Sequence, residues 1–235
     1  AVRLCDLRPN GTSALISHGF INLTMNGSFE NPRHLTVDQK FKVNLQLDQI
    51  AYFLPEGHRL RLAISNCYWP FVWPSPEIGT INIFSGKLVI PEMSENTIAE
   101  QYVFDDPITG DLWNCEEKRA SSSTREEFFD EISGEKIIEV KHDSGSTLDL
   151  EHGLETDSSV VERWFIKDND PLSAKSEVNW HQSMKRAKWS IDTYSSLKVT
   201  CSSSSFFLTA SIEAYEGKEL VFSRNFEETV DRKFI

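Results

Sequence analysis

Apolar and polar side chains alternate along several segments of this chain, with a period of two residues. Successive side chains of a β-strand point to opposite faces of a sheet, so each alternating run describes a strand in a sheet with one buried side. Helical periodicity is weak, and the best candidate for a helix is the short segment 123–130. The clearest alternating runs are residues 41–47, 59–64, 80–83, 189–199 and 206–214. The pattern therefore predicts an all-β protein.

Turn-forming residues separate these runs. Tyr215 and Leu220 flank Glu216-Gly217, which predicts a hairpin between the last two strands. Strands at this spacing are typical of a β-sandwich or jelly roll, and the missing alternation of strands and helices argues against a doubly wound sheet. Further turns are predicted at Pro9-Asn10-Gly11, Pro55-Glu56-Gly57 and Asp143-Ser144-Gly145.

The two halves of the chain differ in charge and in proline content. Residues 1–91 hold 8 basic and 6 acidic side chains and seven of the nine prolines, whereas residues 92–235 hold 16 basic and 30 acidic side chains. We place a boundary near residues 91–96, between a jelly-roll region at 1–91 and an acidic antiparallel β region at 92–235 that completes or packs on the sandwich. The net charge of −12 argues against nucleic-acid binding, because contacts to phosphates need a positive face.

The longest apolar stretch, residues 50–54, is far shorter than the roughly 20 residues that span a bilayer, so no membrane partner is predicted. The four cysteines, Cys5, Cys67, Cys115 and Cys201, lie far apart and form no C-x-x-C pair. We expect four reduced thiols that act mostly as small hydrophobic residues in strands, with a single disulfide left open. Cytosolic residence is the default expectation.

Motifs for catalysis are missing from the sequence. It contains no G-x-S-x-G, P-loop, H-E-x-x-H or G-x-G-x-x-G motif, and its six histidines are scattered singly. We therefore predict no catalytic residue, no cofactor and no metal in this chain. Two acidic stretches, Asp105-Asp106-Pro107 and Asp168-Asn169-Asp170-Pro171, suggest either turns or a calcium site. The turn is favoured, because Asp and Asn before proline bond to their own backbone and no longer ligand ladder follows.

The most unusual segment is aromatic and proline-rich, running from Tyr68 to Pro76. Three prolines prevent central strand pairing, so the segment is predicted to be a loop that carries Tyr68, Trp69, Phe71 and Trp73. These aromatics either fold back as a core plug, or contact another domain, or stack on sugar rings. The first two interpretations are equally supported by composition, and sugar binding is the weakest.

Several motifs resemble one family. The segment Val2-Arg3-Leu4-Cys5-Asp6-Leu7 with Pro9-Asn10-Gly11, the segment 19–24, the strand Gly57-His58-Arg59-Leu60-Arg61-Leu62-Ala63-Ile64-Ser65 and the loop from Trp69 to Pro76 are similar to the jelly-roll region of the CocE/NonD hydrolases. Segments 170–174 and 221–224 resemble the tail of the long members of that family, whereas residues 92–163 have no counterpart that we can match.

The family includes enzymes similar to X-Pro dipeptidyl-peptidases and esterases, which pair an α/β-hydrolase domain holding a Ser-His-Asp triad with a C-terminal jelly roll of galactose-binding-like fold. The resemblance covers only the jelly roll, so it implies a non-catalytic accessory domain that packs on the absent catalytic domain and shapes its substrate entrance. Tyr68, Trp69, Phe71 and Trp73 are the expected interdomain contact. The alternatives are a carbohydrate- or ligand-binding module and a complete enzyme with an unrecognised site.

The chain opens inside a strand motif, without methionine. We therefore expect a piece of a longer hydrolase whose jelly roll lacks its first strands. Missing strands would leave a sheet edge at Val2–Leu7 unpaired, and bare edges recruit other strands. The chain is accordingly expected either to associate with itself or to cover that edge with residues 92–235.

Overall fold

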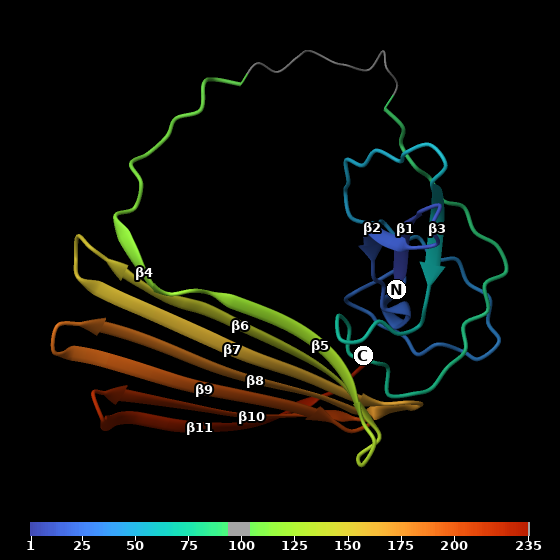
Figure 1. Ribbon diagram of the computed structural model, residues 1–235. Helices are drawn as coiled ribbons and strands as arrows, with labels where there is room; N and C mark the ends of the chain where they lie inside the picture. Colours follow the sequence, from blue (N-terminus) through green and yellow to red (C-terminus); the bar gives the residue numbers. More distant parts are fainter. Residues whose placement is uncertain (94–103, 235) are drawn as a thin grey trace.

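The computed structural model describes residues 1–93 and 104–234, and it is nearly all-β, as the alternation predicts (Figure 1). Its strands form two antiparallel sheets, an arrangement consistent with a β-sandwich. One sheet is short and lies in the first half of the chain, and the other is long and lies in the second half. Figure 1 shows the short sheet at one end of the long one.

The short sheet has three strands in the order β2-β1-β3. These are β1 (Val2–Leu7), β2 (Ser13–Gly19) and β3 (Arg59–Ile64), and a single 3-10 turn, η1 (Leu23–Met25), follows β2. The turn predicted after β1 is present, with the Gly11 amide donating to the Arg8 carbonyl at 2.9 Å. Because β1 is paired on both sides, the bare edge expected at Val2–Leu7 does not exist.

Two of the predicted strands are wrong. Residues 41–47 and 80–83 lie outside the strands, although their alternation is as clear as that of β3. Only residues 45–48 lie beside β2 among the contacts described, where the Asp48 amide donates to the His18 carbonyl at 3.0 Å and the Ser17 hydroxyl donates to the Asp48 carbonyl at 2.7 Å. Alternation fixes which side chains share a face, but a strand also needs a continuous ladder with a neighbour.

The long sheet is an antiparallel meander in the order β11-β10-β9-β8-β7-β6-β4, with β5 also paired to β6. The predicted strands at 189–199 and 206–214 are confirmed, and so is the final hairpin, in which Tyr215 pairs with Leu220. The strands are β4 (Cys115–Arg119), β5 (Ser122–Asp130), β6 (Glu135–Asp149), β7 (Leu154–Lys167), β8 (Asp170–Arg186), β9 (Trp189–Cys201), β10 (Ser205–Glu216) and β11 (Glu219–Asp231).

Two further local predictions fail within this sheet. The candidate helix at 123–130 is strand β5, all of whose residues pair with β6. The predicted turn Asp143-Ser144-Gly145 is instead an irregularity inside β6, where the pairing with β7 shifts between Asp143 and Ser146. In both places, pairing with a neighbouring strand overrides the local preference of the sequence.

The two faces of the long sheet differ in chemistry. The pleat and the register place mostly charged and polar side chains on what we call the polar face, including Glu139, Arg163, Glu177, Asn179, Asp192, Tyr194, Ser196, Lys198 and Ser211. The opposite, apolar face carries Ile138, Val140, Val160, Trp164, Val178, Trp180, Ile191, Leu197, Val199, Leu208, Ala210, Ile212, Phe222 and Phe226. The expectation that the alternating runs bury one side is wrong here, because none of these apolar residues is buried.

The predicted boundary at residues 91–96 lies partly outside the described residues. On either side of it, the chain passes from the coil that follows β3 to the start of the long sheet. The division into 1–91 and 92–235 therefore stays a prediction. The described part of the chain contains no helix that is long and apolar enough to cross a membrane.

Candidate functional site

The aromatic and proline-rich segment is a loop, as predicted, and it lies between the two sheets. Its backbone turns through a cis Trp69–Pro70 bond, and the Val72 amide donates to the Tyr68 carbonyl at 3.0 Å. The four predicted contact residues are thereby divided into two pairs. Trp69 and Trp73 form one pair, with rings 5.0 Å apart and perpendicular, and Tyr68 and Phe71 form the other, with rings 5.1 Å apart and nearly parallel.

The inner pair seats the loop on the long sheet. The Trp73 ring meets the edge of Phe206 at 5.4 Å, and its indole Nε1 donates to Cys201 Sγ at 3.3 Å. Phe206 and Cys201 are a cross-strand pair of β10 and β9 on the apolar face. The loop therefore covers one end of that face, next to the last residues of the chain.

Arg232, near the C-terminus, stabilises the contact between the loop and the long sheet. It is 5% exposed, donates to the carbonyls of Pro74 and Ser202, and lies 4.9 Å from the centre of the Phe206 ring. Burial lowers the pKa of its guanidinium. A buried cation that reaches two carbonyls and a ring fixes the position of the loop, because moving it would leave a desolvated charge without those partners.

The outer pair faces away from that contact and joins a second aromatic group. Tyr68 also stacks with Phe20 at 5.7 Å, and the Arg3 guanidinium lies 4.6 Å from the centre of the Tyr68 ring. Phe71 nonetheless stays 69% exposed. The loop thus presents an aromatic surface, Tyr68 and Phe71, on a backbone stiffened by three prolines. We call these two residues the outer aromatic pair.

A second cluster, which the sequence did not suggest, lies under the short sheet. Asp6 on β1 is 1% exposed and accepts hydrogen bonds from the Tyr52 hydroxyl at 2.7 Å and from His58 Nδ1 at 2.8 Å. The Tyr52 bond is the largest cause that lowers the Asp6 pKa, followed among the favourable causes by His58. A period-two pattern marks Asp6 as one inward position of β1. Nothing in the sequence indicates which partners the coil between β2 and β3, about forty residues long, brings to it.

The Asp6–His58 pair has the form of a base held by a carboxylate. General-base catalysis also needs a nucleophile within reach of the free ring nitrogen. Among the described residues no hydroxyl or thiol bonds to His58 Nε2. The hydrogen bonds from Tyr52 and His58 to Asp6 hold the coil that precedes β3 against β1.

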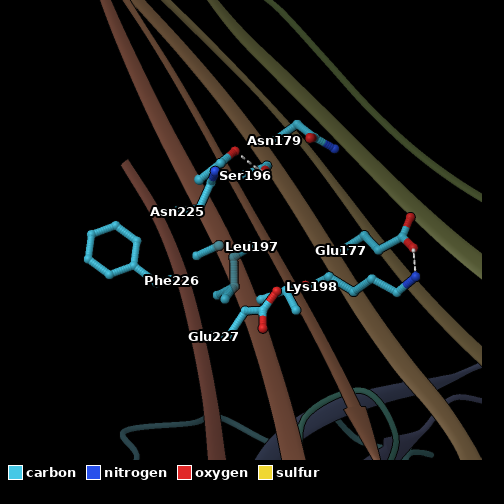
Figure 2. Close-up of a pocket in the computed structure, with 11 residues that line it drawn as sticks. Glu177, Asn179, Ser196, Leu197, Lys198, Asn225, Phe226 and Glu227 are labelled. Atoms are coloured by element: carbon cyan, nitrogen blue, oxygen red, sulfur yellow. Dashed lines mark hydrogen bonds and ion pairs between the residues drawn. The ribbon is translucent and has the colours of Figure 1, made fainter. Parts of the chain in front are cut away.

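A shallow hollow of about 380 Å3 lies on the polar face of β8–β11 (Figure 2). One cross-strand row of small polar side chains forms its floor. In this row, the hydroxyls of Ser196 and Ser211 form a hydrogen bond of 2.8 Å. Glu177 and Lys198 pair at its side. Phe226 points away from the floor in Figure 2, in keeping with its place on the apolar face, so this hollow offers no aromatic platform for a sugar ring.

The remaining candidates from the sequence are the acidic stretch at 168–171, a metal site and the four cysteines. Asn169 adopts a positive φ in the turn between β7 and β8, so Asp168 and Asn169 form the predicted turn, and Asp170 and Pro171 begin β8. Within residues 1–93 and 104–234, no group of three or more His, Cys, Asp or Glu side chains has the arrangement of a metal site. All four cysteines are free thiols, three of them in strands β1, β4 and β9, whereas Cys67 lies in coil.

Comparison with known proteins gives one match. No curated protein and no solved structure matches the chain. A family model does match, over residues 1–106, which include the short sheet and the whole aromatic loop. The resemblance inferred from the strand and loop motifs is thereby confirmed for this part of the chain: residues 1–106 match the X-Pro dipeptidyl-peptidase C-terminal non-catalytic domain.

Proposed function

We propose that this chain is the accessory region of a CocE/NonD-type serine hydrolase, that it packs on the catalytic α/β-hydrolase domain and that it shapes the entrance for substrate. The observation that carries the proposal is the match of residues 1–106 to a domain described as C-terminal and non-catalytic. Such a domain implies a catalytic partner in the parent protein.

The outer aromatic pair is the proposed contact with the catalytic domain. Exposed aromatic side chains on a stiff loop lose little conformational entropy on docking, and each buries a large area. Removal of apolar surface from water contributes about 25 cal/mol per Å2, so a docked Phe71 would stabilise the contact by about 1 to 2 kcal/mol. Trp73 supports the loop from behind by its contact with Phe206 of the long sheet, and Trp69 packs against Trp73.

The test uses the full-length hydrolase that carries this region, with the variant Phe71→Asp. Phe84→Asp is the matched control, because Phe84 is 70% exposed and contacts only the Lys40 ammonium among the described aromatic and cationic groups. We expect Phe71→Asp to lower the melting temperature of the enzyme and its kcat/KM, and Phe84→Asp to change neither. Equal behaviour of the two variants would contradict the proposed contact.

A second measurement concerns the chain by itself. We expect no hydrolysis of activated esters or X-Pro peptides by the isolated chain. Turnover that survives repurification and tracks with His58 would show instead that the chain carries its own active site.

A further inference from the structure

The apolar face of the long sheet is open over most of its length. Among the described residues, Trp73 and Arg232 cover the end at Phe206 and Cys201, and Figure 1 shows the short sheet at that end. Away from it, Trp180 is 46% exposed, Leu197 38% and Phe226 41%. The chain as a whole exposes 18266 Å2, whereas a compact protein of its mass exposes roughly 11,000 Å2.

The open surface is as large as one side of a protein interface. Its central row runs across six strands as Val140, Glu162, Val178, Leu197, Ala210 and Phe226, and a similar row flanks it on each side. Three rows about 7 Å apart on strands about 4.8 Å apart cover roughly 600 Å2. That area, in which polar and charged side chains such as Glu162, Ser195 and Arg224 stand among the apolar ones, is at the lower end of what each partner buries in stable complexes, about 600–1,000 Å2.

The apolar face has the alternation of large and small side chains that the packing of two sheets requires. Large side chains stand beside small ones across neighbouring strands: Trp180 pairs with Ser195, and Leu197 pairs with Ala210. Two twisted sheets pack about 10 Å apart with side chains of one filling the gaps of the other. A sheet face with alternating ridges and gaps is therefore complementary to a second copy of itself.

The charge of the protein does not oppose such a contact. Although the chain carries −12, the charged side chains in the three rows are Glu162, Arg224 and Glu228, whose sum is −1. The ion pairs that Glu139 forms with Arg163 and Glu177 with Lys198 lie on the polar face, which would stay in solvent. Self-association through the apolar face therefore brings little like charge together.

We infer that the apolar face docks on the same face of a second copy of this chain, forming a symmetric dimer with a two-sheet core. This contact does not use the outer aromatic pair. A result against the dimer would therefore not contradict the proposed function, and a result against the proposed function would not contradict the dimer. A two-fold axis makes each copy bury the same patch.

The test is sedimentation velocity with light scattering on the isolated chain, across roughly 1–100 µM. We expect a particle of twice the 26.9 kDa chain mass. Phe226→Asp and Phe207→Asp form a matched pair, because these two phenylalanines are 41% and 42% exposed and lie on adjacent strands but on opposite faces. Phe226→Asp should raise the dimer Kd at least about 30-fold, and Phe207→Asp should change it less than about 2-fold.

A second pair of variants separates loss of the dimer from loss of folding. Ser195→Arg adds a bulky charge at the centre of the apolar face without removing a contact, and Ser196→Arg adds the same charge to the polar face of the same strand. With unchanged circular dichroism, only Ser195→Arg should dissociate the dimer. A wild-type chain that stays monomeric at 100 µM, or equal effects of the two arginines, would overturn the inference. A monomer whose apolar face is instead protected by the catalytic domain in the full-length enzyme would overturn it as well and leave the proposed function intact.

Discussion

The two regions of the molecule are stabilised in different ways. Residues 1–93 contain three strands of six or seven residues, and most of the remaining chain is coil held to them by particular side chains. The long sheet has strands of up to 17 residues, joined mostly by short turns, and its backbone pairs with itself almost throughout. The first region therefore depends on individual side chains, such as Asp6 and Trp73, whereas the second depends on nearly continuous backbone pairing.

The largest expected loss of stability comes from a change in the backbone of the long sheet, at Gly145. Gly145 has φ +75°, and a Cβ there would lie 2.2 Å from the Arg119 carbonyl oxygen. We expect Gly145→Ala to lower the free energy of unfolding by about 3 kcal/mol, because strain and a backbone clash add. Gly217→Ala is the control, since Gly217 has φ +61° with open space around it, and should cost about 1 kcal/mol. Urea denaturation measures both, and equal costs would argue against the importance of the close approach at β4.

The next effect concerns the contact between the regions. Trp73→Ala removes a half-buried ring from Phe206 and a donor from Cys201, and we expect a loss of about 2 kcal/mol. Trp189→Ala, at the far end of the long sheet, should cost less than about 1 kcal/mol, because Trp189 is an exposed residue. If the two substitutions cost the same, the loop does not join the regions as described.

Within the first region, the expected effect is a loss of stability that is largest near neutral pH. Asp6→Ala removes the acceptor that Tyr52 and His58 share, so the melting temperature should fall by roughly 5 °C at pH 7. Because the Asp6 pKa is lowered in the fold, its contribution is present above the unfolded pKa of about 4 and is lost as the pH falls through the folded pKa. The difference between wild type and variant should therefore shrink on acidification, and a constant difference from pH 7 to pH 2 would contradict this account.

The smallest effect is local to the start of the long sheet. The Trp113 indole donates to Asp149 at 3.0 Å and, with the backbone amide of His152, lowers the Asp149 pKa to about 2. Trp113→Phe should raise that pKa toward the ordinary value near 3.9, as measured by carboxyl carbon NMR titration. Asp130, whose low pKa comes mainly from the Ile132 amide, is the internal control and should not change.

The parts of the fold that the sequence predicts are those in which local pattern and pairing agree. The alternation at 59–64, 189–199 and 206–214 predicted β3, β9 and β10, because each of these segments has a neighbour of matching length. The same alternation at 41–47 produced no strand, since its neighbour β2 offers it only isolated hydrogen bonds. Alternation reports the faces of a segment, whereas pairing depends on residues far away in the chain.

The candidate site was predictable in composition but not in arrangement. Prolines and aromatics identified 68–76 as a loop of unusual content, and its residues do lie together. Their division into an inner and an outer pair follows from Phe206, Cys201 and Arg232, which come more than 120 residues later. The Asp6 cluster was missed for the same reason, because its partners Tyr52 and His58 are brought back by coil that carries no periodic signal.

The meander topology has a consequence for the order of assembly in time. From β6 to β11 every strand pairs with the strand that follows it in sequence, so each hairpin closes over a few residues as soon as its second arm is available. The short sheet, in contrast, waits for β3, which arrives some forty residues after β2. We therefore expect the late-synthesised half of this protein to reach its native pairing sooner than the early one, with Trp73 seated only once both have formed.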